Sequence, residues 1–215
     1  MTYLEAVNNV LTRLREANVV SVTDTDYSRL IGTFINDAKT QVENSYAWSA
    51  LQSDILVSTV AGTSDYSLVG SGQTFRVLDV LNDTNNVALV NKQKAEITRK
   101  QRTGVSGDTA PYEYAFSGVD TNGDTKVALW PTPDDVYSVA FTVVVPQAKL
   151  VSDTDIIQVP TQPILLGAWA RAIAERGEDQ GMNSSEVYGL YKDALSDTIA
   201  IESSRTSTDV SWMGI

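Results

Sequence analysis

The sequence contains no cysteine and no histidine among its 215 residues. Without cysteine the chain can form no disulfide, use no thiolate nucleophile and offer no thiolate to zinc or an iron–sulfur cluster. Without histidine it lacks the usual general base, the side chain that titrates near neutral pH and the commonest zinc ligand. Catalysis by Asp, Glu, Lys, Ser or Tyr alone stays open, as in glycosidases. The two absences favour a protein that is not an enzyme, with no catalytic, cofactor-binding or metal site.

Long hydrophobic runs are also missing. No stretch approaches the roughly 18 consecutive apolar residues that a membrane span needs. The first residues lack the basic region of a signal peptide and already show helical periodicity. We therefore expect a soluble protein that acts where it is made and has no membrane partner.

Positive charge is scarce, since 16 Lys and Arg face 27 Asp and Glu, which gives a net charge of −11 and a pI near 4.4. An acidic surface repels nucleic acid, because phosphate binding depends on clustered Lys and Arg. The exception is the basic run KQKAEITRKQR at residues 92–102. It fits a solvated loop or a short helix face, with contact to an acidic neighbour as the alternative.

The first predicted element is an amphipathic helix that ends near Glu16. Thr2 followed by Glu5 is the pattern of a capping box at a helix start. Apolar residues then recur every three or four positions, and four of them are expected in the helical core: Leu4, Val7, Leu11 and Leu14.

A second amphipathic helix is predicted over about residues 24–47, with Thr23 and Asp26 as its capping pair. Gly32 lies inside it, where glycine costs up to about 1 kcal/mol relative to alanine. A close contact with another helix is the plain explanation. The core residues expected from this segment are Leu30, Phe34 and Trp48.

The periodicity changes to two over about residues 51–159, which predicts short strands. The clearest alternation runs from Tyr137 to Val145, and Asn122-Gly123 indicates a hairpin with a type I′ turn. Further strands are expected at 54–60, 75–81, 87–90, 112–116 and 126–130, which together favour an antiparallel sandwich or barrel.

Helical periodicity returns at Thr161, with Ile164, Leu165 and Trp169 as expected core residues and Gly177 as a natural stop. Asn183 and Glu186 then cap a last helix that ends near residue 202.

The order of elements predicts an α+β fold. Two helices alone leave much of each apolar stripe exposed, whereas burial of each large side chain stabilises by about 1.5–3 kcal/mol. We therefore predict a four-helix bundle from residues 1–50 and 160–203, an inserted antiparallel β-domain over 51–159 and an extended C-terminal tail over 204–215.

The tail begins polar and ends with four apolar residues, Val210, Trp212, Met213 and Ile215. A segment of this kind suits insertion into a partner's groove or addition to the edge of a partner's sheet. Packing on its own subunit and simple disorder are the alternatives.

Motifs that carry chemistry are few. Asp120, Asn122 and Asp124 resemble the start of a calcium loop, but the glycine after the third ligand and the distal glutamate are absent. The pair Asp134-Asp135 has no identifiable second carboxylate partner. A turn between strands explains both patterns better.

Four stretches, in this order, resemble the head-to-tail adaptor proteins of short-tailed bacteriophages, also called tail tubular protein A or head completion proteins. They are AVNNVLTRLREANVVSV with ENSYAWSAL, TVAGTSDYSLVGSGQTFRVLDV, VALWPTPDDVYSVAFTVVV and QVPTQPILLGAWARAIAERGED. Val69-Gly70 stands where the family often has a proline, which is a departure at that loop.

The resemblance implies a virion protein of the neck, assembled in the host cytoplasm, that forms a ring of about twelve subunits. Its partners would be the portal protein, gripped by the bundle and the tail, and the tail nozzle or tubular protein, met by the β-domain. Double-stranded DNA would pass through the lumen without specific binding, and no cofactor is implied. Two other classes stay open: a tail-associated receptor- or carbohydrate-binding module, and a hydrolase built on paired carboxylates.

Overall fold

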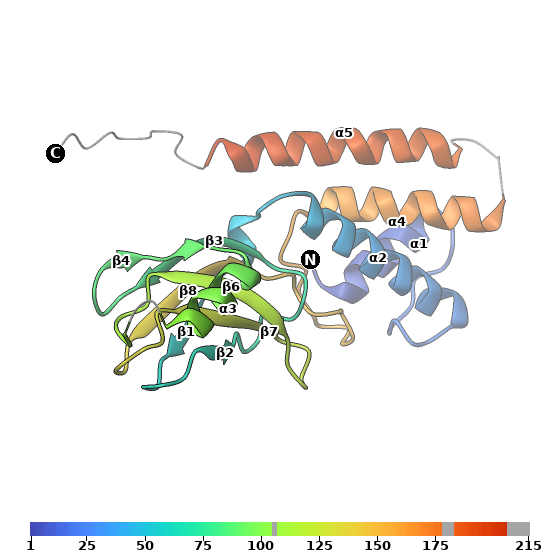
Figure 1. The fold of residues 1–215 in the computed structure, drawn as a ribbon. Coiled ribbons are helices and arrows are strands. Elements are labelled where there is room, and N and C mark those ends of the chain that lie inside the picture. Colours follow the sequence, from blue (N-terminus) through green and yellow to red (C-terminus); the bar gives the residue numbers. More distant parts are fainter. Residues whose placement is uncertain (105–106, 178–182, 206–215) are drawn as a thin grey trace. The chain divides into compact units, whose positions relative to one another are not determined.

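The computed structural model describes residues 1–104, 107–177 and 183–205, and it divides into two compact units. The helical unit comprises residues 1–50 together with the chain from residue 147 onward, and the β unit comprises residues 51–146. Helices from both ends of the sequence flank a β region, so the α+β class predicted from the sequence is confirmed. Figure 1 shows the elements of both units.

Helix α1 (Tyr3–Arg13) begins with the predicted capping box: the Thr2 side chain accepts from the Glu5 backbone N–H, and the Glu5 carboxylate accepts from the Thr2 N–H. Its buried face is Tyr3, Ala6, Val7, Val10 and Leu11. The helix ends earlier than predicted, because Arg15 adopts a positive φ of 60° that breaks the helical path.

Helix α2 (Asp26–Ser45) starts two residues later than predicted, and its capping pair is different. Thr25 and Ser28 exchange the capping hydrogen bonds, so the prediction of Thr23 with Asp26 was wrong. The Ser28 hydroxyl is buried and also donates to the Val22 carbonyl, which ties the cap to the preceding loop. A serine can close the box as well as an acidic residue can, so the sequence pattern alone was ambiguous.

Helices α4 (Thr161–Arg176) and α5 (Ser184–Ser203) end the described chain. Helix α4 packs against α1, α2 and α5, and Figure 1 shows α4 and α5 side by side. The stop at Gly177, which has φ of 64°, and the capping box of Asn183 and Glu186 both lie where the sequence predicted them.

Residues 147–159 belong to the helical unit, whereas the sequence assigned them to the β-domain. The segment runs along α1 and α2: the Tyr3 N–H donates to the Asp155 carbonyl at 2.8 Å, and the Val22 N–H donates to the Asp153 carboxylate at 2.9 Å. Burial alternates along residues 152–159, as it does in a strand. The segment's hydrogen-bond partners in the helical unit are the N-terminal segment, the loop before α2 and side chains of α2 itself.

The β unit is a sandwich of two four-stranded sheets. One sheet has the order β1-β8-β3-β4 and is wholly antiparallel, with β1 (Gln52–Ser58), β8 (Ser138–Val144), β3 (Arg76–Asn82) and β4 (Val87–Ala88). The other has the order β2-β7-β6-β5, with β2 (Asp65–Ser67), β7 (Thr125–Trp130), β6 (Glu113–Val119) and β5 (Val90–Asn91). A short 3-10 helix, η1 (Ser49–Leu51), precedes β1.

Two details of this unit differ from the prediction. Strands β5 and β6 are parallel, so the domain is not purely antiparallel. In the turn between β6 and β7, Gly123 has a φ of 91°, but Asn122 is not among the described non-glycine residues with positive φ. A type I′ turn needs positive φ at both central residues, so the hairpin is present but the predicted turn type was wrong.

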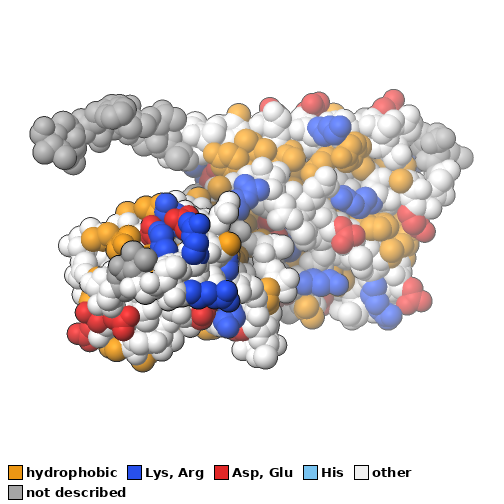
Figure 2. Space-filling view, viewed as in Figure 1, with side chains coloured by type: hydrophobic (Ala, Val, Ile, Leu, Met, Phe, Trp, Pro, Cys, Tyr) orange, Lys and Arg blue, Asp and Glu red, His pale blue; other side chains and the backbone are white. Residues whose placement is uncertain are grey.

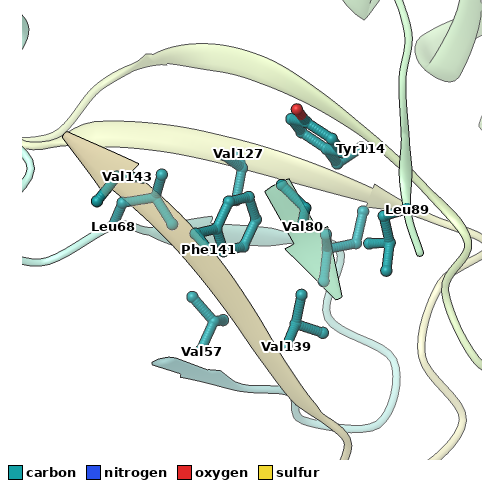
Figure 3. Close-up of a cluster of buried hydrophobic side chains, with 10 residues drawn as sticks. Val57, Leu68, Val80, Leu89, Tyr114, Val127, Val139, Phe141 and Val143 are labelled. Carbon is teal, nitrogen blue, oxygen red and sulfur yellow. The ribbon is translucent and has the colours of Figure 1, made fainter. Parts of the chain in front are cut away.

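The core of the sandwich lies between the facing sheets (Figure 3). Phe141 and Val143 of β8 belong to this core together with Val127 of β7 and Tyr114 of β6. The Tyr114 and Phe141 rings meet edge to face with centroids 5.6 Å apart. Because side chains alternate along a strand, the residues between these core positions lie on the outer faces of the two sheets.

The outer face of the β2-β7-β6-β5 sheet is covered by helix α3 (Lys94–Thr103). Ile97 of this helix is fully buried against Ala115, Ala128 and Trp130. The small side chains of Ala115 and Ala128 leave room for the helix to approach. The basic run is therefore a helix anchored by one apolar residue, which settles one of the alternatives that the sequence left open.

Candidate interaction surfaces

The ten residues predicted as helical core divide into two groups. Val7, Leu11, Trp48, Ile164 and Leu165 are buried. The others are partly exposed: Leu4, Leu14, Leu30, Phe34 and Trp169. In α1 and α2 the most buried stripe lies about one position away from the predicted stripe.

The tryptophans illustrate the two environments. Trp48 is 1% exposed, and its indole N–H donates to the Val42 carbonyl at 2.8 Å. Trp169 instead lies under the Arg13 guanidinium, whose carbon is 5.4 Å from the ring centroid. That contact joins α1 to α4.

The predicted portal-binding residues Val210, Trp212, Met213 and Ile215 lie outside the described residues. Their role stays a prediction.

A buried ion pair, which the sequence analysis missed, lies in the helical unit. The Lys39 ammonium is 3.0 Å from the Glu43 carboxylate, and the two side chains are 2% and 1% exposed. Lys39 also donates to the Gln147 carbonyl at 2.7 Å, and the Gln147 N–H donates to Glu43 at 3.3 Å. Burial raises the pKa of the Glu43 carboxyl above its ordinary value, although Lys39 and Gln147 both act to lower it. The pair fixes the point at which the chain enters the helical unit from β8.

One turn earlier on α2, Asn36 binds the same returning segment. Its side chain donates to the Leu150 carbonyl at 3.2 Å and accepts from the Leu150 N–H at 2.9 Å. It also donates to the Tyr3 hydroxyl at 3.2 Å. Lys39 and Glu43, spaced i and i+4 on a helix, are a visible signal in the sequence, but only the structure shows that their side chains are buried.

The end of α5 is held by a second polar contact. The Glu202 carboxylate accepts from the Ser49 backbone N–H at 2.8 Å and from the Ser49 hydroxyl. These hydrogen bonds lower the pKa of the Glu202 carboxyl, and Arg205, 3.0 Å away, adds to the effect. The last described turn of α5 is thereby tied to the residue where η1 begins.

Helix α3 carries the densest positive charge of the chain, and Figure 2 shows Lys and Arg gathered over this part of the β unit. Lys100 pairs with Glu113 at 2.6 Å and with Glu96 at 3.1 Å, and Lys94 pairs with Asp65 at 3.2 Å. The pairs with Glu113 and Asp65 hold the helix on the sheet, and all three pairs neutralise part of its charge.

The outer side of α3 is less neutralised. Arg99 and Arg102 are exposed, and neither forms a salt bridge with a carboxylate in the described part of the chain. Because they lie two and five positions after the buried Ile97, both project from the side of the helix opposite to the sheet. Of the basic run's side chains, these two are therefore directed outward as cations.

The motifs that resembled chemical sites are turns. The Asp120 carboxylate accepts from the backbone N–H groups of Asn122 and Asp124, at 2.8 and 3.0 Å, within the β6–β7 connection. Asp134 accepts from the Tyr137 hydroxyl at 2.6 Å. Across the described ranges, no cluster of three or more Asp and Glu side chains could hold a metal ion.

The exposed aromatic residues of the β unit do not form a flat platform for sugars. Tyr112 and Phe116 are 44% and 38% exposed. The Phe116 ring meets Phe75 and Tyr114 edge to face, at centroid distances of 5.9 and 5.8 Å. No stacked aromatic pair is found among the described residues of this unit.

The comparisons with known proteins bear on the family. The family model described as SU10 adaptor protein matches residues 1–213. The chain belongs to the SU10 adaptor family. This membership confirms the resemblance to head-to-tail adaptors that the sequence suggested.

Other comparisons add little to the family assignment. No curated relative matches the chain. A matching solved structure is titled "Neck of empty GTA particle computed with C6 symmetry"; it shares 11% identity, with 86% of this chain and 87% of that chain covered and a TM-score of 0.28. A TM-score this low supports no inference about this adaptor. Every helix in the described ranges is too short or too polar to cross a bilayer.

Proposed function

We propose that this protein is a structural component of a bacteriophage neck that joins the portal of the head to the tail. The observation that carries the proposal is the match of the adaptor family model to residues 1–213. The lack of cysteine and histidine agrees with a protein that joins components and catalyses no reaction.

In this proposal, about twelve copies form a closed ring by a heterologous contact between neighbours. The helical domain of residues 1–50 and 147–203 and the tail of residues 204–215 bind the portal, and the inserted β-domain meets the tail nozzle. Residues Val210, Trp212, Met213 and Ile215 form the apolar anchor in the portal.

The acidic character of the protein suits a conduit for DNA. A wall of net negative charge does not neutralise phosphates, so it gains no affinity from counterion release. At physiological ionic strength this repulsion extends only about 8 Å, so it keeps DNA mobile in the lumen without expelling it.

Deletion of residues 210–215 tests the portal contact. The truncated protein is expected to keep the thermal unfolding midpoint of the full chain and to lose capture by immobilised portal protein. A matched control replaces the same six residues by glycine and serine, which keeps the length and removes the apolar side chains. Undiminished capture of both variants would refute the anchoring role, and electron microscopy of the full chain bound to portal would show whether a ring forms.

A further inference from the structure

The two outer faces of the β sandwich differ in chemistry, and they point in opposite directions because the two sheets share one core between them. One outer face is covered by α3, which presents Arg99 and Arg102 to solvent. The other is the outer face of the β1-β8-β3-β4 sheet, which no helix of the β unit covers in the described residues.

The uncovered face carries an acidic row. Asp54 of β1 and Asp79 of β3 both pair in register with Thr142 of β8, so the three residues lie in one line across three strands. The Asp54 carboxylate accepts from the Thr142 hydroxyl at 2.7 Å, and both aspartates are exposed. The exposed Arg76 lies on the same face, where it pairs in register with Val144, two positions along β8 from Thr142.

An apolar row lies beside the acidic one. Leu56 pairs with Ala140, Ala140 with Leu81, and Leu81 with Ala88, which places four apolar residues in line across the whole sheet. Leu56 is 65% exposed. Ala88 is also exposed, whereas Leu81 and Ala140 are half-buried, so the row offers a narrow apolar strip beside the aspartates.

We propose that helix α3 of one copy docks on the uncovered sheet face of the next copy, with Arg99 and Arg102 binding Asp54 and Asp79. The Cβ atoms of two helix residues three positions apart, such as Arg99 and Arg102, are about 5–6 Å apart. Two aspartates separated by two strand spacings are roughly 10 Å apart. The long arginine side chains can span this difference. The exposed Ala95, one turn before Arg99, then faces the apolar row.

A second copy is the partner that the charges favour. The chain has a net charge of −11, whereas residues 92–102 contain five basic residues and one glutamate, so α3 is a positive surface on an acidic protein. Duplex DNA is the less favoured partner, because Lys94 and Lys100 are already paired with carboxylates. Of the basic run only Lys92, Arg99 and Arg102 remain, too few for firm phosphate binding.

A contact between opposite faces of one domain is heterologous, so it continues from copy to copy and closes into a ring when the rotation allows. This inference rests on the proposed function, because the ring is what the contact would build. It adds to that proposal the two surfaces that join neighbouring copies.

A charge exchange tests the contact. The variant R99E/R102E and the variant D54K/D79K should each lose self-association by about tenfold or more in sedimentation velocity, because like charges then meet. Mixed in equal amounts they should associate again in alternation, since each variant's helix then opposes a face of opposite charge. Matched controls with the same change in net charge are K149E/K192E and D37K/D193K, at exposed positions of the helical unit.

Site-specific cross-linking tests the same contact if the chain assembles only when it is bound to portal protein. The chain has no cysteine, so the double variant A95C/L56C carries thiols only at the proposed contact. Because these positions lie on opposite faces, oxidation of the double variant should give disulfide-linked dimers and a ladder of higher multimers. The ladder is expected in the purified protein or in complexes with portal. Each single variant should form at most a disulfide-linked dimer.

Absence of the ladder in both preparations would overturn the contact. So would failure of the mixed variants to associate under conditions in which the unchanged chain self-associates. Loss of duplex DNA binding by R99E/R102E with unchanged self-association would overturn it in favour of DNA. If portal still captures the chain while the ladder is absent, the contact fails and the adaptor role stands. If the ladder forms but portal does not capture the chain, the adaptor role fails instead.

Discussion

A Cβ atom placed on Gly32 would overlap the Tyr3 hydroxyl oxygen. Tyr3 opens α1 and is 5% exposed, so its ring has little room to move away. Val22 would also lie 3.0 Å from that Cβ atom. The close approach of α1 to α2 therefore depends on the absence of a side chain at position 32, which agrees with the helix contact expected from a glycine within a helix.

Gly32→Ala should destabilise the helical unit by about 1–3 kcal/mol, because the added methyl group forces a shift in a packed core. Tyr3→Phe in the same chain should recover part of the loss by removing the hydroxyl. Urea unfolding measures both variants. Gly189→Ala is the control, since that glycine also lies in a helix and has open space around it; there alanine should stabilise by about 0.4–1 kcal/mol. Equal effects at the two positions would contradict the packing argument.

Lys39→Met should cost about 3–5 kcal/mol at pH 7, because it leaves the buried Glu43 carboxylate without its partner. The deficit should shrink as the pH falls, because without the Lys39 charge the pKa of Glu43 rises further and the folded variant takes up a proton more readily than the unchanged chain does. Burial raises the pKa of Glu43, so the folded state takes up a proton more readily than the unfolded chain and gains stability as the pH falls.

The double variant Lys39→Met with Glu43→Leu should recover much of that loss in chemical denaturation, because no buried charge remains. Arg29→Met is the control, since Arg29 and its partner Asp26 are exposed and such pairs contribute about 0–1 kcal/mol. A pH-independent deficit in Lys39→Met would show that the lost contact is packing alone.

Glu202→Gln should loosen the last turn of α5 by about 1 kcal/mol, because neutral acceptors bind Ser49 more weakly than a carboxylate does. The Ser49 contacts lower the pKa of Glu202, so their stabilisation is complete above the ordinary glutamate value of about 4.3 and is lost as the pH falls through the lower folded-state pKa. Hydrogen exchange of the α5 amides near residue 202 measures the change. Unaltered exchange in the variant, with Glu186 at the other end of the helix as an internal reference, would argue against the contact.

Ile97→Ala should lower the free energy of unfolding by about 2–5 kcal/mol. Ile97 is fully buried between α3 and the sheet and is the apolar residue that fixes this helix there. Thermal unfolding of the full chain measures the loss. Ile201→Ala is the matched control, since that side chain is 58% exposed and its truncation should change stability by less than about 0.5 kcal/mol. A silent Ile97→Ala variant would mean that the salt bridges of Lys94 and Lys100 suffice to hold α3.

Local sequence patterns correctly predicted the features that depend only on residues close together in the sequence. The boxes at Thr2 and Asn183 and the stop at Gly177 are found as predicted, because each involves hydrogen bonds or backbone angles within one helical turn. The predicted capping pair of α2 was wrong because Thr23 with Asp26 and Thr25 with Ser28 both have the spacing of a capping box. The buried hydrogen bond from Ser28 to Val22 favours the second pair.

Long-range relations were beyond such patterns. Nothing local distinguishes the segment 147–159 from a strand, and only its bonds to Tyr3, Asn36 and Lys39, more than 100 residues away in sequence, assign it to the helical unit. The i, i+4 spacing of Lys39 and Glu43 equally fits an exposed helix face.

The sequence by itself determined the family, the α+β order, the net charge and the absence of thiol and imidazole chemistry, since these follow from residue identities and short-range periodicity. Only the tertiary structure decided that the basic run is a helix held by Ile97, and that its arginines and the row of Asp54 and Asp79 lie on opposite faces of one sandwich. The reason is physical: strand register and sheet pairing bring together residues that are far apart in the chain, and a one-residue shift of register would turn every side chain of a strand to the other face.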